Sequence, residues 1–109
     1  MTLIQDKIDL KRVKRSAASA CSLLKALAHE DRLVLLCQLA EGERCVGELE
    51  ELLDIRQPSL SQQLGVLRNE GLVTTRREGT RIYYALASRE AIAVMYTLYQ
   101  QFCLPKSGR

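Results

Sequence analysis

Apolar residues recur every three or four positions over the first part of the chain, which is the spacing of one face of an α-helix. The residues of this first stripe are Leu10, Val13, Ala17, Cys21, Leu24 and Leu27. A second, shorter stripe consists of Leu33, Leu36, Cys37 and Ala40. Gly42 follows it and can adopt the left-handed conformation that often ends a helix. The pattern predicts a long amphipathic helix and then a short apolar helix that stops at Gly42.

The middle of the chain predicts two more helices separated by a turn. After a brief extended link at residues 45–46, residues 47–53 have the pattern of a short helix, which residues 54–56 interrupt. A fourth helix is expected to begin around Pro58, because proline suits the first helical position, where a missing amide hydrogen costs nothing. It ends at Gly71, and its buried side is expected to consist of Leu60, Leu64 and Leu67.

The pattern changes to β-branched and aromatic residues at 72–77 and 81–86, with a compact turn between them. These segments predict a β-hairpin with arginines at its tip. Ser88 is suited to cap a last helix that ends at Pro105. The apolar stripe of that helix consists of Ile92, Met95, Tyr96, Tyr99, Phe102 and Cys103. The expected fold is mainly α with a small β-hairpin, five helices in all, in the order of a winged helix-turn-helix.

The length of 109 residues, with one Phe and no Trp, predicts one domain over residues 1–109 with an aliphatic core and short flexible ends. The central elements are expected to bury one another. The apolar stripes of the first and last helices are then left uncovered, so we expect a homodimer that pairs through these two helices.

The net charge is only +3, but the charges are unevenly placed. Basic residues dominate residues 7–15, acidic residues dominate residues 41–54, and arginines dominate residues 56–81. No stretch of about 18 apolar residues and no apolar leader is present, so we expect a cytoplasmic protein without a membrane partner.

The outer face of the fourth predicted helix is polar but nearly uncharged, which suits hydrogen bonding to base edges. Together with the hairpin arginines, it predicts a surface for double-stranded DNA. The residues expected to contact DNA are Gln57, Ser59, Ser61, Gln62, Gln63, Arg68, Arg76, Arg77 and Arg81. A two-fold dimer would require an operator that is an imperfect palindrome, with half-sites about 10 base pairs apart or a small multiple of that. Taken alone, the arginines would also fit ordinary solvated hairpin charges.

Two other classes of function compete with DNA binding. An enzyme is disfavoured, because there is no glycine-rich phosphate loop and the single histidine, His29, lies near no nucleophile motif. His29 is expected to be a cap or surface residue. We expect no cofactor. A protein-interaction module that uses a winged helix without touching DNA is the second competitor, and a steep salt dependence of DNA binding would distinguish the two.

Several segments resemble the ArsR/SmtB family of winged-helix repressors. They are residues 24–29, Arg32 and Leu33, residues 47–49, residues 57–64, Leu67 and Arg68, residues 71–73, and Tyr83 and Tyr84. The resemblance covers residues 16–104 and is most specific over residues 58–63. It implies a homodimeric repressor that leaves DNA when an inducer binds, often a metal or metalloid held by cysteines.

The family's metal-binding patterns are incomplete in this sequence. Where a Cys-Val-Cys motif is usual, the chain has Cys45, Val46 and Gly47, and residues 88–104 contain no Asp or His for the other common site. A lone thiolate does not complete the coordination shell of a soft ion. The resemblance therefore implies no metal site, with arsenite or another thiophilic metal held by Cys45 and other cysteines as the alternative.

The remaining cysteines match a particular branch of the family. Cys37 and Cys103 resemble the thiol pair of the branch that includes BigR, SqrR and HlyU, whose members sense persulfides and other oxidised sulfur species. The resemblance implies that a disulfide or a longer sulfur bridge joins the two thiols and lifts repression. Buried packing is the alternative for each of them, since free cysteine is often a core residue. Cys21 is expected to be plain core, and Cys45 either an inert or an accessory thiol.

Overall fold

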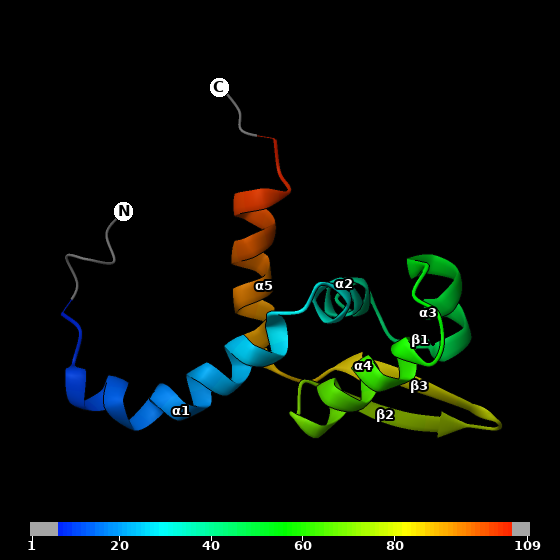
Figure 1. Cartoon of the computed structure of the whole chain (residues 1–109), viewed down its shortest axis with the longest axis horizontal. Coiled ribbons are helices and arrows are strands. Elements are labelled where there is room, and N and C mark those ends of the chain that lie inside the picture. The colour runs from blue at the N-terminus through cyan, green and yellow to red at the C-terminus, as the bar shows by residue number, and fades with distance from the viewer. Residues whose placement is uncertain (1–6, 106–109) are drawn as a thin grey trace.

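The computed structural model describes residues 7–105 (Figure 1). The elements follow in the order α1 (Leu10–Leu27), α2 (Glu30–Leu39), β1 (Arg44–Cys45), α3 (Val46–Leu53), α4 (Ser59–Asn69), β2 (Val73–Glu78), β3 (Arg81–Leu86) and α5 (Arg89–Phe102). The predicted winged helix-turn-helix is confirmed, with α3 and α4 as the helix pair and β2 and β3 as the wing. The flexible ends expected from the sequence concern residues 1–6 and 106–109, which lie outside the described residues.

The helices divide into a packed body and two projecting arms. In Figure 1, α2, α3 and α4 lie together against the sheet, whereas α1 extends to the left of this body and α5 rises above it. The two arms are the helices whose apolar stripes were expected to remain uncovered.

The core of the body is built from leucines, as the aliphatic composition predicts. The side chains with no exposed surface that are largest by volume are Leu35, Leu36, Leu49, Leu60, Leu64 and Leu67. The predicted buried side of α4, which consists of Leu60, Leu64 and Leu67, is confirmed. Their burial at every third or fourth position fixes the rotation of α4, so that Ser61, Gln62 and Arg68 face outward.

The buried side of α2 differs from the prediction. Leu35, Leu36 and Leu39 are buried, whereas Cys37 and Ala40 are exposed. The reason is that α2 packs against α4 and also borders a cavity toward α5, and Cys37 and Ala40 lie on the cavity side. Because α2 itself carries leucines on several sides, its sequence pattern is compatible with more than one buried side.

The wing belongs to a larger sheet than the predicted hairpin. Among the described residues the strands form one antiparallel sheet of three strands in the order β1-β3-β2. The extended link predicted at residues 45–46 is a strand one residue earlier, because Val46 already begins α3. This strand pairs with β3, with Arg44 opposite Tyr84 and Cys45 opposite Tyr83. A strand of two residues is too short to show the alternating pattern of a sheet. This third strand ties the base of the wing to the start of α3.

The helix ends confirm several local predictions. The Ser88 hydroxyl accepts a hydrogen bond from the Ala91 N–H at 3.0 Å, and His29 Nδ1 accepts one from the Asp31 N–H at 3.2 Å, so both residues cap helices. Gly42 has a positive φ just after α2, as expected for a residue beyond a helix end. Pro58 lies one position earlier than predicted, as the residue that precedes α4.

The two projecting helices leave large apolar side chains exposed. On α1 these are Leu10, Val13 and Leu24, and on α5 they are Ile92, Tyr96, Tyr99 and Phe102, which is 80% exposed. Cys21, predicted as core, is also exposed in this stripe of α1, because no other element of the described chain covers that face. None of the helices within residues 7–105 combines the length and apolarity needed to cross a lipid bilayer.

Candidate functional site

The outer face of α4 is open to solvent over most of its length. Ser61, Gln62 and Arg68 are exposed, whereas Ser59 is partly buried. A Cβ atom built on Gly65, near the middle of the helix, would meet no atom within 4 Å beyond the adjoining residues and backbone of its own helix. The surface therefore presents hydroxyl, amide and guanidinium groups around a central position where the backbone itself is accessible.

Two glutamines predicted to contact DNA are engaged within the protein. Gln57 Oε1 accepts a hydrogen bond from the Ser61 N–H at 3.0 Å, which satisfies an amide in the first turn of α4. Gln63 is partly buried, and its Oε1 accepts a hydrogen bond from Arg32 Nη1 on α2 at 2.9 Å. Fewer side chains of α4 are therefore available to bind DNA than the sequence predicts.

The arginines of the wing have different roles in the structure. Arg76 Nε donates to Glu43 Oε2 at 2.9 Å, and Arg76 Nη1 donates to Glu78 Oε2 at 2.6 Å. The Arg76 guanidinium also lies 4.6 Å from the centre of the Tyr83 ring. These hydrogen bonds raise the pKa of Arg76, and the hydrogen bond from Arg76 lowers the pKa of the Glu43 carboxyl. Arg76 thus fastens the wing to the loop before β1.

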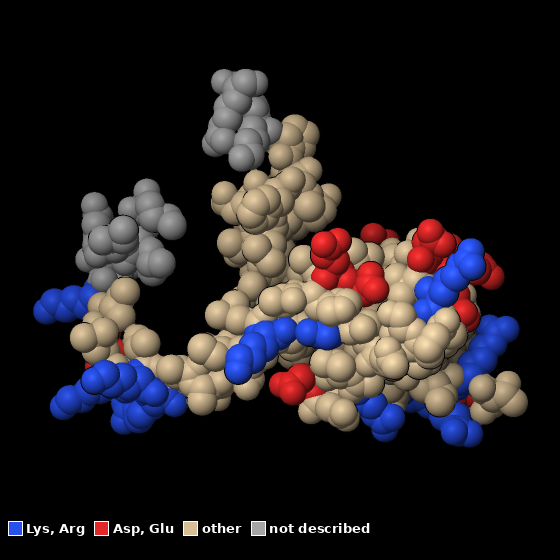
Figure 2. All heavy atoms as spheres, in the orientation of Figure 1, with Lys and Arg blue, Asp and Glu red and all other residues tan. Residues whose placement is uncertain are grey.

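Arg77 and Arg81 are exposed near the tip of the hairpin, on either side of its turn. In Figure 2, Lys and Arg side chains lie along the lower edge of the body and over the first part of α1, and others lie across the middle of the view and at its upper right. Most acidic side chains lie on the upper side of the body, over α2 and α3. Exposed basic side chains on the wing, Arg77 and Arg81, favour the approach of a polyanion to the wing side.

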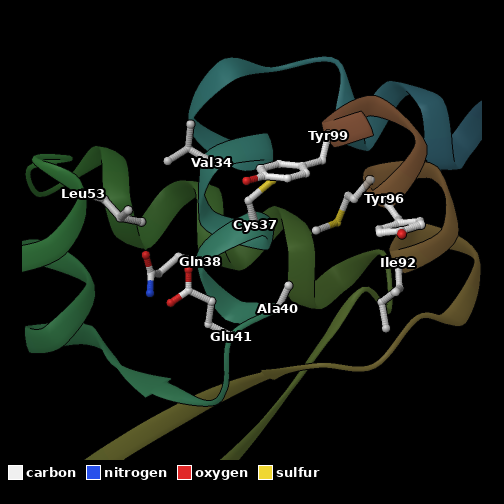
Figure 3. A pocket seen from close by; sticks show the side chains of 10 residues that line it. Val34, Cys37, Gln38, Ala40, Glu41, Leu53, Ile92, Tyr96 and Tyr99 are labelled. Carbon is white, nitrogen blue, oxygen red and sulfur yellow. The ribbon is translucent and has the colours of Figure 1, made fainter. Parts of the chain in front are cut away.

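Cys37 lies on the face of α2 that is turned toward α5. It borders a cavity of about 430 Å³ whose apolar lining includes Val34, Met95, Tyr96 and Tyr99 (Figure 3). In Figure 3 the Cys37 side chain lies next to the Tyr99 ring. Partial desolvation by these neighbours raises the pKa of the Cys37 thiol.

Cys103 directly follows α5 and is exposed. The charge of a Cys103 thiolate adds to the raised pKa of Cys37. Both are free cysteines. Helices α2 and α5 face one another across the cavity that Cys37 borders, and Cys103 lies just beyond the end of α5.

The other two cysteines lie away from this pair. Cys45 is buried at the start of α3, where its backbone N–H donates to Glu48 Oε1 at 2.9 Å. Cys21 is on the exposed stripe of α1. Within the part of the chain that the structure describes, no three His, Cys, Asp or Glu side chains cluster in a way that could hold a metal ion.

Two residues of the site were not among the predicted site residues, namely Arg32 and Glu43. Arg32 is the anchor of Gln63, and Glu43 is the anchor of Arg76. Arg32 is one of three consecutive charged residues at the start of α2, so its charge alone is a weak sequence signal. The sequence carries no comparable signal for Glu43, because it lies in an acidic segment that resembles a solvated surface.

The chain has clear similarity to known proteins. Residues 29–75 match the family described as bacterial regulatory protein, ArsR family. The chain is 53% identical over 102 residues to the biofilm growth-associated repressor of Agrobacterium fabrum, covering 94% of this chain and 87% of that protein. The chain belongs to the ArsR family. It is also 42% identical to the transcriptional activator HlyU of Vibrio cholerae, over 88% of this chain and 89% of that protein.

Solved structures of ArsR-family proteins and their relatives share the fold. The crystal structure of the transcriptional repressor BigR from Xylella fastidiosa has a TM-score of 0.84 and 45% identity, covering 90% of this chain and 100% of that one. A homodimeric winged helix-turn-helix DNA-binding domain from Mycobacterium bovis has a TM-score of 0.71 and 31% identity, covering 88% and 87%. The predicted resemblance to BigR and HlyU is confirmed, and the chain is an ArsR-type transcriptional repressor rather than an enzyme.

Proposed function

We propose that this ArsR-family repressor binds a palindromic operator as a homodimer in the cytoplasm and releases it when a sulfur bridge joins Cys37 and Cys103. The observation that carries the proposal is the thiol pair. Both cysteines are free: Cys37 lies on α2 beside a mostly apolar cavity that is also lined by residues of α5, and Cys103 directly follows α5. A permanent disulfide is not expected in a reducing compartment, so a bridge between them would report a change in sulfur chemistry.

The DNA-binding part of the proposal assigns α4 to the major groove and the wing to the sugar-phosphate backbone. Ser61, Gln62 and Arg68 supply exposed polar groups on α4, and Arg77 and Arg81 supply positive charge on the wing. Of the other predicted contacts, Gln57, Gln63 and Arg76 are bound to other protein groups, and Ser59 is partly buried.

Gly65 offers a test of the α4 assignment. Gly65→Ala is expected to increase the free energy of unfolding by roughly 0.5–1 kcal/mol, because alanine is the better helix former and the position is open. The same methyl group would separate the helix backbone from DNA, so the affinity should fall several-fold. Denaturant titration and fluorescence anisotropy measure the two effects. Gly47→Ala, at an equally open position of α3, is the matched control and should leave affinity unchanged. Unaltered DNA binding by Gly65→Ala would contradict the assignment.

The dimer is supported by the exposed apolar stripes of α1 and α5. An uncovered row of large apolar side chains on a helix is unfavourable in water and is typical of a subunit interface. A homodimeric structure also exists among the relatives. A two-fold axis through these helices would place one copy of α4 on each side, as a palindromic operator requires.

The proposed reaction oxidises the two protein thiols and reduces the sulfane sulfur of an organic persulfide, RSSH. The Cys103 thiolate attacks the outer sulfur of RSSH, the S–S bond breaks and RSH leaves. Cys103 is placed first because it is exposed just beyond the end of α5, whereas Cys37 borders the apolar cavity.

The Cys37 thiolate then attacks Cys103 Sγ, the inner sulfur of the Cys103 persulfide, and the bond from Sγ to the outer sulfur breaks. Hydrogen sulfide leaves, and a disulfide forms from two thiols and one RSSH. If a second RSSH has converted Cys37 to a persulfide, the same closure gives a trisulfide, with two RSH and one hydrogen sulfide released. In both cases the two cysteines lose two electrons in total.

The bridge would connect the DNA-binding and dimerising parts of the protomer. Cys37 is on α2, which packs against α4, and Cys103 follows α5, which carries part of the exposed apolar stripe. Joining them would fix α5 relative to the recognition helix and change the separation of the two copies of α4 in the dimer. Weaker DNA binding would follow from the mismatch with the operator spacing.

The experiment that tests the proposal is a fluorescence anisotropy titration of reduced protein with the palindromic duplex that it selects from a random library. Samples treated with glutathione persulfide or with arsenite are titrated in parallel, and peptide mass spectrometry identifies the modified cysteines. We expect persulfide alone to release DNA, with loss of two hydrogens and with or without added sulfur at Cys37 and Cys103. Release by arsenite alone, or by neither reagent, would contradict the sulfur-sensing proposal.

A further inference from the structure

We infer that Arg32 and Gln63 form a positioning link that sets the orientation of the recognition helix α4 against α1, so that Gln63 holds the helix rather than reads DNA. This inference rests on the proposed DNA-binding function. One guanidinium on α2 contacts both of the other helices, with Nη1 bound to Gln63 Oε1 at 2.9 Å and Nε bound to Ala26 O at 2.7 Å.

The carbonyl groups at the end of α1 show why an arginine lies at this position. The last four carbonyls of a helix have no partner within the helix. The Leu24 carbonyl accepts from the Ala28 N–H at 2.9 Å, and the Leu27 carbonyl accepts from the His29 N–H at 2.8 Å. The Lys25 and Ala26 carbonyls accept from Arg32, whose Nη2 lies 3.1 Å from Lys25 O.

Arg32 therefore both binds carbonyl groups at the end of α1 and connects that helix to α4. Its positive charge lies at the negative end of the α1 dipole, an arrangement that stabilises the helix terminus. The planar guanidinium can bind the two carbonyls and Gln63 together only when α1, α2 and α4 keep one relative orientation. Arg32 and Gln63 are both only partly exposed, which restricts competition from water.

The link joins a helix of the proposed dimer interface to the helix proposed to enter the major groove. In a two-fold dimer, any rotation of α4 relative to α1 changes the distance between the two recognition helices. A weakened link should therefore reduce the ability of the dimer to distinguish operators by the spacing of their half-sites, beyond any effect on affinity for a single half-site.

Adjacent glutamines provide the test. In Gln63→Glu the new carboxylate remains bound to Arg32, which neutralises it, so affinity for the selected palindromic duplex should stay within about threefold of wild type. In Gln62→Glu, the matched control on the exposed side, the same charge would face DNA and affinity should fall about tenfold or more. Equal losses in both variants would overturn the inference, because Gln63 would then face DNA as well.

Gln63→Leu removes the acceptor and is measured on duplexes whose half-site spacing is the selected one or is changed by one base pair. We expect affinity for the selected spacing to fall about tenfold and the preference over the altered spacing to be reduced, with unchanged binding to unrelated DNA. A preserved spacing preference would overturn the inference. If Gln63→Leu does not fold, the comparison of Gln63→Glu with Gln62→Glu still shows whether Gln63 faces Arg32 or DNA. Failure of the wild-type protein to bind any duplex would instead contradict the proposed function itself.

Discussion

Serine at either Cys37 or Cys103 is expected to leave the protein bound to its operator at persulfide concentrations that release the wild type. In the wild type, persulfide treatment should lower the affinity for operator DNA by about 5- to 150-fold, the usual range for coupling between two sites. Each serine variant should keep the affinity of the reduced protein, because both cysteines are exposed and neither supplies core packing. Anisotropy titrations before and after treatment measure the difference.

Cys21→Ser is the control for this experiment. Cys21 is also an exposed thiol, but it lies on α1, away from the cavity that Cys37 borders. Its removal should leave persulfide-induced release intact. If Cys37→Ser or Cys103→Ser still releases DNA as the wild type does, the thiol pair is not the sensor.

The ionisation of Cys37 adds a pH dependence to the reaction. Since desolvation and the charge of Cys103 raise the pKa of Cys37, its thiolate fraction at neutral pH is small and increases as the pH rises. Closure of the bridge needs that thiolate and should accelerate with pH. In Cys103→Ser one cause of the raised pKa is removed, so iodoacetamide should label Cys37 faster than in wild type at the same pH. Mass spectrometry of the Cys37 peptide measures the rate, and an unchanged rate would show that the two thiols do not interact.

The sequence predicts the fold well where one helix face is buried and the other is polar. The spacing of Leu60, Leu64 and Leu67 predicts both the existence of α4 and its rotation, and Gly42 and Ser88 mark helix ends that the structure contains. These features depend on contacts within a few residues or on one repeating period, so a single sequence is sufficient to reveal them.

The prediction is weaker where distant residues decide the outcome. The pairing of Arg44 and Cys45 with β3 depends on a strand some 40 residues later, and the exposed position of Cys37 depends on how α2 shares its surface between α4 and a cavity. Arg76 has the same sequence context as Arg77, yet only Arg76 meets Glu43, which lies 33 residues away. The sequence therefore does not distinguish an arginine that pairs with a carboxylate from one that is free to contact a ligand.

Dimerisation is expected to be the property on which DNA binding depends most strongly, and Tyr96→Glu should remove both together. Tyr96 is 63% exposed in one protomer and lies between Ile92 and Tyr99 on the apolar stripe of α5. A carboxylate placed in an apolar interface loses its hydration without gaining a partner, which is strongly unfavourable. The dimer dissociation constant should rise by about 30- to 1,000-fold, the effect of losing a central interface residue.

A monomer presents only one recognition helix, so its affinity for the palindromic duplex should fall by at least about 100-fold, whereas non-specific binding should change little. Sedimentation velocity and anisotropy on the same samples measure the two quantities. Leu52→Glu is the control, since Leu52 is similarly exposed, at 54%, but lies on α3 outside the stripes of α1 and α5. It should remain dimeric. A dimeric Tyr96→Glu variant would place the subunit contact elsewhere, and a monomer with undiminished affinity would show that one recognition helix is sufficient for operator binding.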